Sequence, residues 1–411
     1  MNNYVKSAIN YINLFSALVL TASTIFTFSI FMRVGLFVFF ISYIIEVFLE
    51  KKWVGFKLDK KRIYFLIMLI FFLLAPLSIL FDDSPIYFKF LFERRLALLG
   101  FSIIGLFGLN EKYNIKYFFQ TVILISLIAV SYLLFWKVGI YEFVSNPNRA
   151  EIFNLARIQY IHGHMMFNFY LNISLIGIWY VFSNYWNKIS PFKFALYSSI
   201  VLLFIYILFI SEGRTGFTEA TLLIVSFVFI QIWKKKRKFA IGLVLIIPVI
   251  LFGLFSHHKR MSQKELQTEP RIFLWQSAMS LIKEKPVFGF GISNAQEEFD
   301  IERTKFQTEE FRIWSSDQKH LDSHNQFLQT TLEFGLFGLI LLIIIYVFPI
   351  FIVERKKLLL TLMIVGLCLY HSIFDMFLTG QFGLIFCILI SLLILSKDTT
   401  LNAVKMEQIE D

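Results

Sequence analysis

The sequence predicts an all-α membrane protein that crosses the bilayer many times. Of its 411 residues, 57% are hydrophobic and only 17% are charged, whereas a typical soluble domain carries about 25% charged residues. The mean hydropathy is +0.68, and apolar runs of roughly 20 residues, the length that a bilayer-spanning helix needs, recur along the chain. No polar stretch is long enough to form a soluble domain of ordinary size, so a soluble enzyme with one membrane anchor is excluded.

About twelve transmembrane helices are expected from these apolar runs. They divide the chain into nine helices within residues 1–255, a large periplasmic loop at 256–323, and three helices with a short cytoplasmic tail within 324–411. The expected spans are 12–31, 34–49, 63–81, 95–109, 117–136, 166–182, 194–210, 217–233, 239–255, 327–353, 358–377 and 382–396.

Lysine and arginine residues predict the sidedness of the helices, because short cytoplasmic loops carry an excess of both. With a cytoplasmic N-terminus, one alternate set of loops collects the basic residues at 51–62 and later clusters such as KKKRK at 234–238. We therefore interpret the net charge of +10 as topology anchors and expect no nucleic-acid partner. The two cysteines, Cys368 and Cys387, lie inside apolar runs, so no disulfide or thiolate zinc site is expected.

The loop at 256–323 is far longer than the other connections, and long loops of this kind are usually functional. Pro270 stands where a first helical turn would begin, and apolar residues recur at helical spacing from Arg271 to Glu284. Pro286 ends this helix, and a second amphipathic stretch at 294–311 leads back toward the membrane. We therefore expect a helical loop that lies on the bilayer surface and caps a cavity.

The strongest candidate for chemistry is His324, in the run LDSHNQ at 321–326, where the long loop re-enters the membrane. The unperturbed pKa of histidine is about 6.5, so this imidazole can accept a proton from a hydroxyl group near neutral pH. The alternative is a polar helix start, in which Asp322 or Ser323 caps the helix and His324 lies in the headgroup layer. The spacing alone favours neither interpretation.

Two arginines are candidate ligands for an anion. Arg214, in the SEGRTG turn at 211–216, interrupts two apolar runs, and an arginine at membrane depth is costly unless it meets an anion or a carboxylate. Its guanidinium suits a phosphate or diphosphate, but a local pair with Glu212 is equally compatible with the sequence. Arg271 opens the loop helix, where a cation opposes the helix dipole, so contact with a bound anion would account for its position.

Three residues of the outer loop at 137–165 are weaker candidates. Arg157, His162 and His164 could contact a substrate, but an exposed loop role is favoured for them. No specific role can be assigned to either histidine from the sequence.

Ionisable residues inside the later spans are also unusual, because such groups are costly in a bilayer. Glu333 lies within a span, and a structural partner is favoured over a catalytic role for it. His371 and Asp375 are four residues apart and would share one face of a helix. An intramembrane hydrogen bond is favoured for these two residues over a role in lining a cavity.

Three segments resemble the O-antigen ligase family, part of a larger group of bacterial membrane ligases and polymerases that act on lipid-linked glycans. SEGRTG at 211–216 is similar to the family's serine–arginine turn between two spans. RIFLWQSAMSLIKEKPVFGFG at 271–291 resembles its loop signature, and HNQFLQTTLEFGLFGL at 324–339 resembles its histidine–asparagine span entry. The order and spacing of the three segments carry the resemblance.

The resemblance implies a GT-C-like glycosyltransferase of the bacterial inner membrane whose active site faces the periplasm. Such enzymes transfer a glycan from undecaprenyl diphosphate to an acceptor hydroxyl, with inversion at the anomeric centre and without a metal or cofactor. The acceptor of a ligase is the lipid A–core, and membrane lipids surround the enzyme. By this resemblance His324 is the general base, and Arg214 and Arg271 bind the diphosphate. Arg157 and Asn325 are further expected substrate contacts.

Two other functions are compatible with the sequence. A repeat-unit polymerase of the same superfamily would share the fold, the donor and His324, but its acceptor would be another carrier-linked repeat. A solute transporter or lipid flippase is less favoured, because transporters usually place coupling charges near the midplane and often show repeated halves. Here the ionisable residues gather at one face of the membrane.

Overall fold

The computed structural model describes residues 3–25, 29–54, 56–80, 87–109, 113–161, 163–185, 189–211, 213–235, 269–306, 311 and 321–396. Within these residues every regular element is a helix, as the sequence predicts. The α-helices are α1 (Asn3–Ser23), α2 (Ser29–Glu50), α3 (Lys60–Ser78), α4 (Phe88–Glu93), α5 (Leu96–Phe107), α6 (Ile115–Ser131), α7 (Ile140–Ser145), α8 (Arg149–Tyr160), α9 (His164–Tyr185), α10 (Pro191–Ile210), α11 (Arg214–Lys235), α14 (Pro270–Glu284), α15 (Ile292–Glu302), α17 (Gln326–Ile352), α18 (Leu358–Phe374) and α19 (Gly380–Leu395). The other segments are the π-helix η1 (Tyr132–Val138) and the 3₁₀ turns η4 (Arg303–Phe306) and η5 (Arg355–Lys357).

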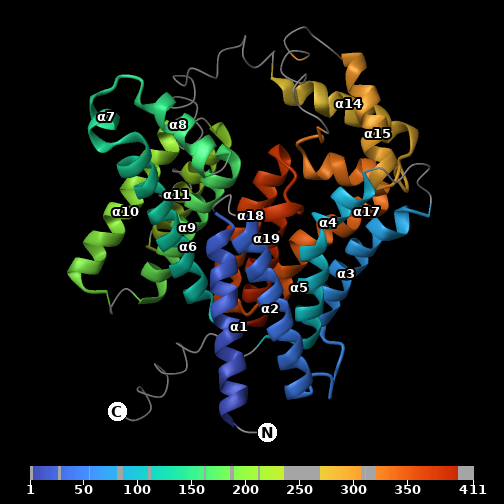
Figure 1. The fold of residues 1–411 in the computed structure, drawn as a ribbon, viewed down its shortest axis with the longest axis horizontal. Helices are drawn as coiled ribbons and strands as arrows, with labels where there is room; N and C mark the ends of the chain where they lie inside the picture. Colours follow the sequence, from blue (N-terminus) through green and yellow to red (C-terminus); the bar gives the residue numbers. More distant parts are fainter. Residues whose placement is uncertain are drawn as a thin grey trace.

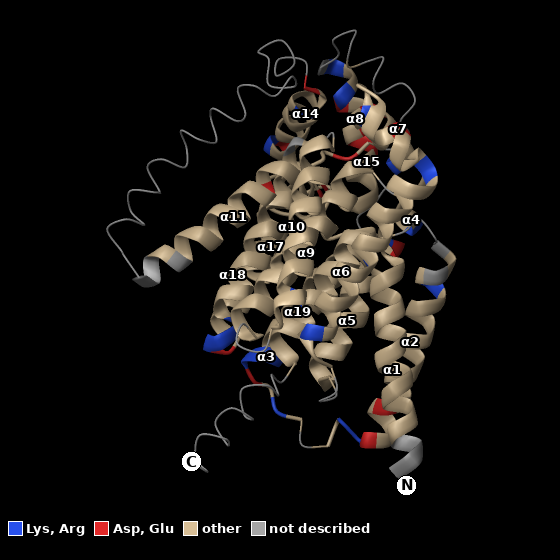
Figure 2. Cartoon of the chain, turned by 90° about the vertical axis from the view of Figure 1, so that its left-hand side faces the viewer, with Lys and Arg blue, Asp and Glu red and all other residues tan. Residues whose placement is uncertain are grey.

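Many of these helices suit a membrane. Among the described residues, seven stretches are long and apolar enough to cross one: Met32–Glu50, Lys60–Ser78, Ile115–Val138, His164–Tyr185, Pro191–Ile210, Gln326–Ile352 and Arg355–Phe374. Shorter apolar segments lie in α1, α11 and α19. Charged residues gather mainly toward the two ends of the bundle, and its middle is mostly uncharged (Figure 2). The chain is therefore a polytopic, helical membrane protein.

Most of the expected spans agree with the observed helices to within a few residues. The span expected at 12–31 is wrong at its end, because α1 ends at Ser23 and α2 begins at Ser29. The span expected at 117–136 covers α6 and η1 together, and the one at 239–255 lies outside the described residues. α5 has 12 residues, and at 1.5 Å per residue it is too short to cross a hydrocarbon core of about 30 Å by itself. The total of twelve spans and the GT-C-like fold therefore stay predictions.

The two ends of the bundle carry different parts of the chain (Figure 1). α1 begins at the end where α2 connects to α3, whereas α7, α8, α14 and α15 lie at the opposite end. The described helices of the two loops that are expected on the outer side, 137–165 and 256–323, thus lie at the same end of the bundle. Which end faces the cytoplasm stays a prediction from the distribution of basic residues.

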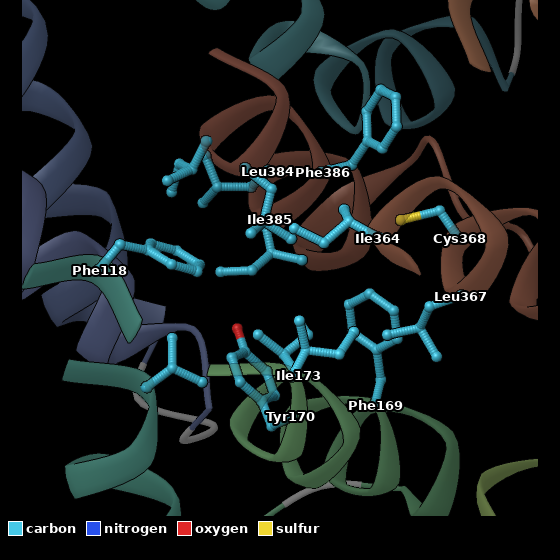
Figure 3. Packing of buried hydrophobic residues seen from close by; sticks show 14 of the residues in the cluster. Phe118, Phe169, Tyr170, Ile173, Ile364, Leu367, Cys368, Leu384, Ile385 and Phe386 are labelled. Carbon is cyan, nitrogen blue, oxygen red and sulfur yellow. The ribbon is translucent and has the colours of Figure 1, made fainter. Parts of the chain in front are cut away.

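α9 is the central helix of the bundle. In its most apolar stretch 83% of the residues are buried, compared with 22% in α10, so α9 is surrounded by other helices and α10 lies at the periphery. Phe169 and Ile173 of α9 pack with Ile364 of α18 and Ile385 of α19 in one apolar core (Figure 3). Both cysteines are buried and free.

α17 is broken at Gly335, where φ is +63° and ψ is −160°. The backbone of residues 286–291, which follows α14, enters this break. Four backbone hydrogen bonds, 2.8 to 3.4 Å long, join residues 286–291 to residues 332–337. A Cβ atom on Gly335 would lie 2.2 Å from the carbonyl carbon of Val287, so only glycine permits the contact. This interlock fixes the position of α14 relative to α17.

Candidate functional site

His324 lies in the non-helical segment immediately before α17. Its φ is +45°, in the left-handed region that residues other than glycine rarely occupy. The His324 N–H donates to Asp322 Oδ1 (2.9 Å), and the Ser323 hydroxyl donates to the Asn325 carbonyl oxygen (3.0 Å). Such a conformation costs on the order of 1–3 kcal/mol and persists only where the surrounding structure holds it, as at many functional sites.

Asn325 is the N-cap of α17. Its side-chain oxygen accepts hydrogen bonds from the N–H groups of Phe327 (2.9 Å) and Leu328 (3.0 Å), two of the donors that the first helical turn leaves unpaired. The alternative in which Asp322 or Ser323 caps this helix is wrong, because the backbone is still non-helical at His324 and Asn325. A substrate contact for Asn325 stays a prediction.

Two carboxylates flank the His324 imidazole. Its Nδ1 lies 3.2 Å from Asp322 Oδ1 and 3.6 Å from Asp375 Oδ1. Burial lowers the pKa of His324, but the Asp375 and Asp322 carboxylates raise this pKa by more, so it lies above its usual value. If the Nδ1 proton points toward the carboxylates, Nε2 is left to accept a proton from a substrate. The side chain is 30% exposed and therefore accessible.

The two carboxyl groups differ in their electrostatics. Burial raises the pKa of Asp322, and the charges of His324 and Arg94 only partly offset this. Burial also raises the pKa of Asp375, but its interaction with His324 outweighs that effect, and the pKa falls below its usual value. Asp375 follows the last residue of α18, so the site joins the entry of α17 to the end of α18.

Arg271 lies beside this cluster. It is the second residue of α14, after Pro270 at the first helical position, as the sequence predicts. Its guanidinium carbon lies 6.0 Å from the ring centre of Phe374, the residue before Asp375, and its Nη1 lies 3.5 Å from Glu269 Oε1. Its Nε is buried and has no hydrogen-bond partner among the described residues. Arg271 can therefore offer a donor to a ligand near His324.

The SEGRTG turn meets the start of α9. Arg214 begins α11, but its side chain and the whole of Glu212 lie outside the described part of the structure. A Cβ atom on Gly213 would lie 2.5 Å from the side-chain nitrogen of Asn168, and one on Gly216 would lie 2.3 Å from the Cβ of the same residue. The glycines of this motif therefore allow close packing of α11 against α9.

Arg157 lies on α8 and is fully buried, with 0% of its surface exposed. Its Nε donates to Asn154 Oδ1 (3.3 Å), and the Asn154 amide donates to the carbonyl oxygen of Ile210, which precedes the SEGRTG turn (3.1 Å). The favoured interpretation of Arg157 as an exposed loop residue is wrong, because α8 packs this side chain into the bundle. His164 is half-buried at the start of α9, and His162 lies outside the described residues.

Residues 199–343 match a protein family described as "O-Antigen ligase". The predicted resemblance to this family is confirmed. The chain is also similar to two proteins named "Putative polysaccharide ligase", one from Rickettsia felis (28% identical over 152 residues) and one from Rickettsia bellii (31% identical over 151 residues). Each of these matches covers 34% of this chain and 36% of the relative, so the chain aligns with only about a third of the length of these relatives.

The segment that matches the O-antigen ligase family contains most of the predicted site. Arg214, Arg271 and His324 lie within it, whereas Arg157 precedes it and Asp375 follows it. The carboxylate that most affects His324, that of Asp375, thus lies just after α18 and outside the matched segment.

A buried ion pair supports the same region from beneath. Arg95 Nη2 lies 2.6 Å from Glu333 Oε2, and both side chains are at most 5% exposed. Glu333 also accepts a hydrogen bond from the Gln329 amide (3.1 Å), which confirms a structural partner for Glu333. Arg95 could not be identified as that partner from the sequence, although two adjacent arginines at the start of an expected span were a signal.

His371 forms the expected intramembrane hydrogen bond, but its partner is Glu219, which the sequence did not indicate. Its Nδ1 lies 3.0 Å from Glu219 Oε1, and the other oxygen of this carboxylate accepts from the Asn172 amide (2.9 Å). The expectation that His371 and Asp375 share a helical face is wrong, because α18 ends at Phe374 and Asp375 has extended backbone. The Glu219 network ties α9, α11 and α18 together below the site.

Proposed function

We propose that the protein is an O-antigen ligase-type glycosyltransferase. It would move a glycan from undecaprenyl diphosphate to a sugar hydroxyl of the lipid A–core, at the periplasmic face of the bacterial inner membrane. The observation that carries the proposal is an accessible imidazole, His324, held between two carboxylates beside Arg271, within the segment that matches the O-antigen ligase family.

His324 acts as the general base in this proposal. Its Nε2 takes the proton of the acceptor hydroxyl while the hydroxyl oxygen attacks the anomeric carbon of the donor sugar. The bond between that carbon and the diphosphate oxygen breaks, and undecaprenyl diphosphate leaves. Attack from the side opposite the leaving group inverts the anomeric centre. The Asp322 and Asp375 carboxylates stabilise the imidazolium that forms and keep the ring oriented.

The arginines act on the leaving group. Arg271, whose buried Nε has no partner among the described residues, donates to the diphosphate, and Arg214 is proposed to do the same. Such donors stabilise the negative charge that grows on the diphosphate as the glycosyl bond breaks. The cleaved bond supplies the free energy of transfer, and the proposal includes no metal or cofactor.

The test is the surface glycan of a deletion strain complemented with the wild-type chain or with His324→Ala. Lipopolysaccharide is resolved on a gel, and the carrier-linked glycan pool is measured beside it. Arg149→Gln serves as a matched control, because Arg149 is an exposed residue of the same end of the bundle. We expect the control to restore the ladder and His324→Ala to leave bare lipid A–core with long carrier-linked chains.

Other outcomes would contradict the proposal in different ways. Core that bears a single repeat without a ladder would identify a polymerase. A normal ladder in the His324→Ala strain would refute the role of this histidine as the base. A deletion strain with an unchanged glycan profile would contradict the function as a whole.

A further inference from the structure

A polar cavity of about 330 Å³ lies next to the His324 cluster. It falls at the small end of the range for small-molecule sites, which is roughly 300–1,000 Å³. Its polar lining residues are Arg94, His164, Asp375, Thr379 and Gln381, and Phe382 and several methionines supply the apolar part. Asp375 is shared between this cavity and the His324 cluster.

One polar group in the wall of the cavity has no hydrogen-bond partner among the described residues. The Thr379 hydroxyl is buried and has no partner among the described residues, and Thr379 is only 4% exposed. The Arg94 guanidinium forms no ion pair with a described residue; it stacks on Phe90 at 5.2 Å and passes 3.8 Å from the position of a Cβ on Gly380. Buried polar groups are normally paired, so the Thr379 hydroxyl indicates a polar ligand, and the half-buried Arg94 guanidinium offers further donors to it.

The mixture of donors and acceptors suits a sugar. Arg94 and Gln381 offer N–H donors, Thr379 can donate or accept, and the Asp375 carboxylate only accepts. The neighbouring hydroxyl groups of a sugar can both donate and accept hydrogen bonds, so they match this set of donors and acceptors. A phosphate group matches it less well, because it would face Asp375 at close range and has no proton to give.

We propose that this cavity binds the acceptor sugar and presents its hydroxyl to His324. The inference rests on the proposed function and adds the acceptor subsite to it. Of the two carboxylates that flank His324, Asp375 also lines the cavity, so it disfavours the donor diphosphate there and leaves this side to a neutral sugar. The diphosphate lies on the side of Arg271. Arg94 and Gln381 are thus specificity residues for the acceptor.

The experiment measures steady-state transfer by the purified full-length chain in detergent, with carrier-linked glycan as donor and lipid A–core from the deletion strain as acceptor. We expect Gln381→Ala to raise the KM for lipid A–core about three- to tenfold and Arg94→Gln to raise it tenfold or more, as the loss of neutral and charged hydrogen bonds implies. The KM for the donor should change less than about twofold in both. Arg149→Gln is the control for loss of an arginine at this end of the bundle, and it should leave both KM values unchanged.

Direct binding separates this inference from the proposed function. Binding of lipid A–core to the His324→Ala protein is compared with binding to the His324→Ala/Gln381→Ala protein, which needs no transfer. Weaker binding in the double variant supports the subsite, even if no transfer is ever observed. A rise in donor KM with unchanged acceptor KM, or equal binding by the two proteins, would overturn the proposal. Gln381→Ala decides the matter if Arg94→Gln does not fold, because it removes no charge.

Discussion

Replacement of Gly335 by alanine tests whether the break in α17 positions the site. The added Cβ would lie 2.2 Å from the carbonyl carbon and oxygen of Val287, and 2.4 Å from the backbone nitrogen of Phe288. These are backbone atoms, so the clash cannot be relieved by a change of rotamer. The φ of +63° is also unfavourable for alanine.

The cost can be worked out from two contributions. A left-handed conformation costs a residue with a Cβ about 1–2 kcal/mol. Displacement of residues 286–291 would weaken the four backbone hydrogen bonds to α17, each of which contributes about 0.5–1.5 kcal/mol. We therefore expect Gly335→Ala to reduce the free energy of unfolding by about 3 kcal/mol or more.

Gly366→Ala is the matched control. Gly366 lies inside α18, and a Cβ there would meet no atom within 4 Å. Because alanine is favoured over glycine in a helix interior, this variant should keep or gain stability, by up to about 1 kcal/mol. The free energy of unfolding in mixed micelles and the transfer rate are measured for both variants. Equal stability of Gly335→Ala and the wild-type chain, with normal transfer, would refute the idea that the interlock sets the distance between α14 and His324.

Three further substitutions test the site. Because only the neutral form of His324 is a base, activity should rise with pH through its pKa. Asp375→Asn removes a carboxylate that raises this pKa, so the rising limb of the kcat/KM profile should move to lower pH and its plateau should fall. A shift of the rising limb to higher pH would contradict the role of His324 as the base. Arg95→Met leaves Glu333 buried without its cation, which should lower the free energy of unfolding by about 3–5 kcal/mol. A loss below about 1 kcal/mol would show that the ion pair is unimportant for stability. Arg271→Gln should raise the donor KM roughly 10- to 100-fold, as loss of a charged hydrogen bond implies, and an unchanged donor KM would remove Arg271 from the diphosphate site.

The helices were predictable because the bilayer imposes their length. An apolar run of about 20 residues has few other uses, so most expected spans within the described residues match helices, although the sequence did not reveal that α1 ends at Ser23. Local signals were equally reliable: Pro270 begins α14, and the helix ends before Pro286. The break at Gly335 was not predictable, because a glycine within an apolar run looks the same whether the helix continues or not.

The partners of the site residues could not be predicted for a different reason. Arg95 and Glu333 are 238 residues apart in the sequence, and a motif in one segment carries no information about which distant segment packs against it. The same holds for Asp375, which looked like a neighbour of His371 on one helix but leaves the helix and turns toward His324. The sequence could indicate candidate residues for the site, but it could not identify the distant groups that contact them.

The arrangement of the site follows from the cost of polar groups in a bilayer. Unpaired polar groups are costly at hydrocarbon depth, so a membrane enzyme can gather them most cheaply where helices begin or end. Here His324 precedes α17, Asp375 follows α18, Arg271 begins α14, and the cavity adds residues from the starts of α9 and α19. Helix ends fray unless they are held, which explains why the turn after α14 is bonded into the break of α17. The glycines that allow this contact should therefore matter to activity as much as the charged residues that it positions.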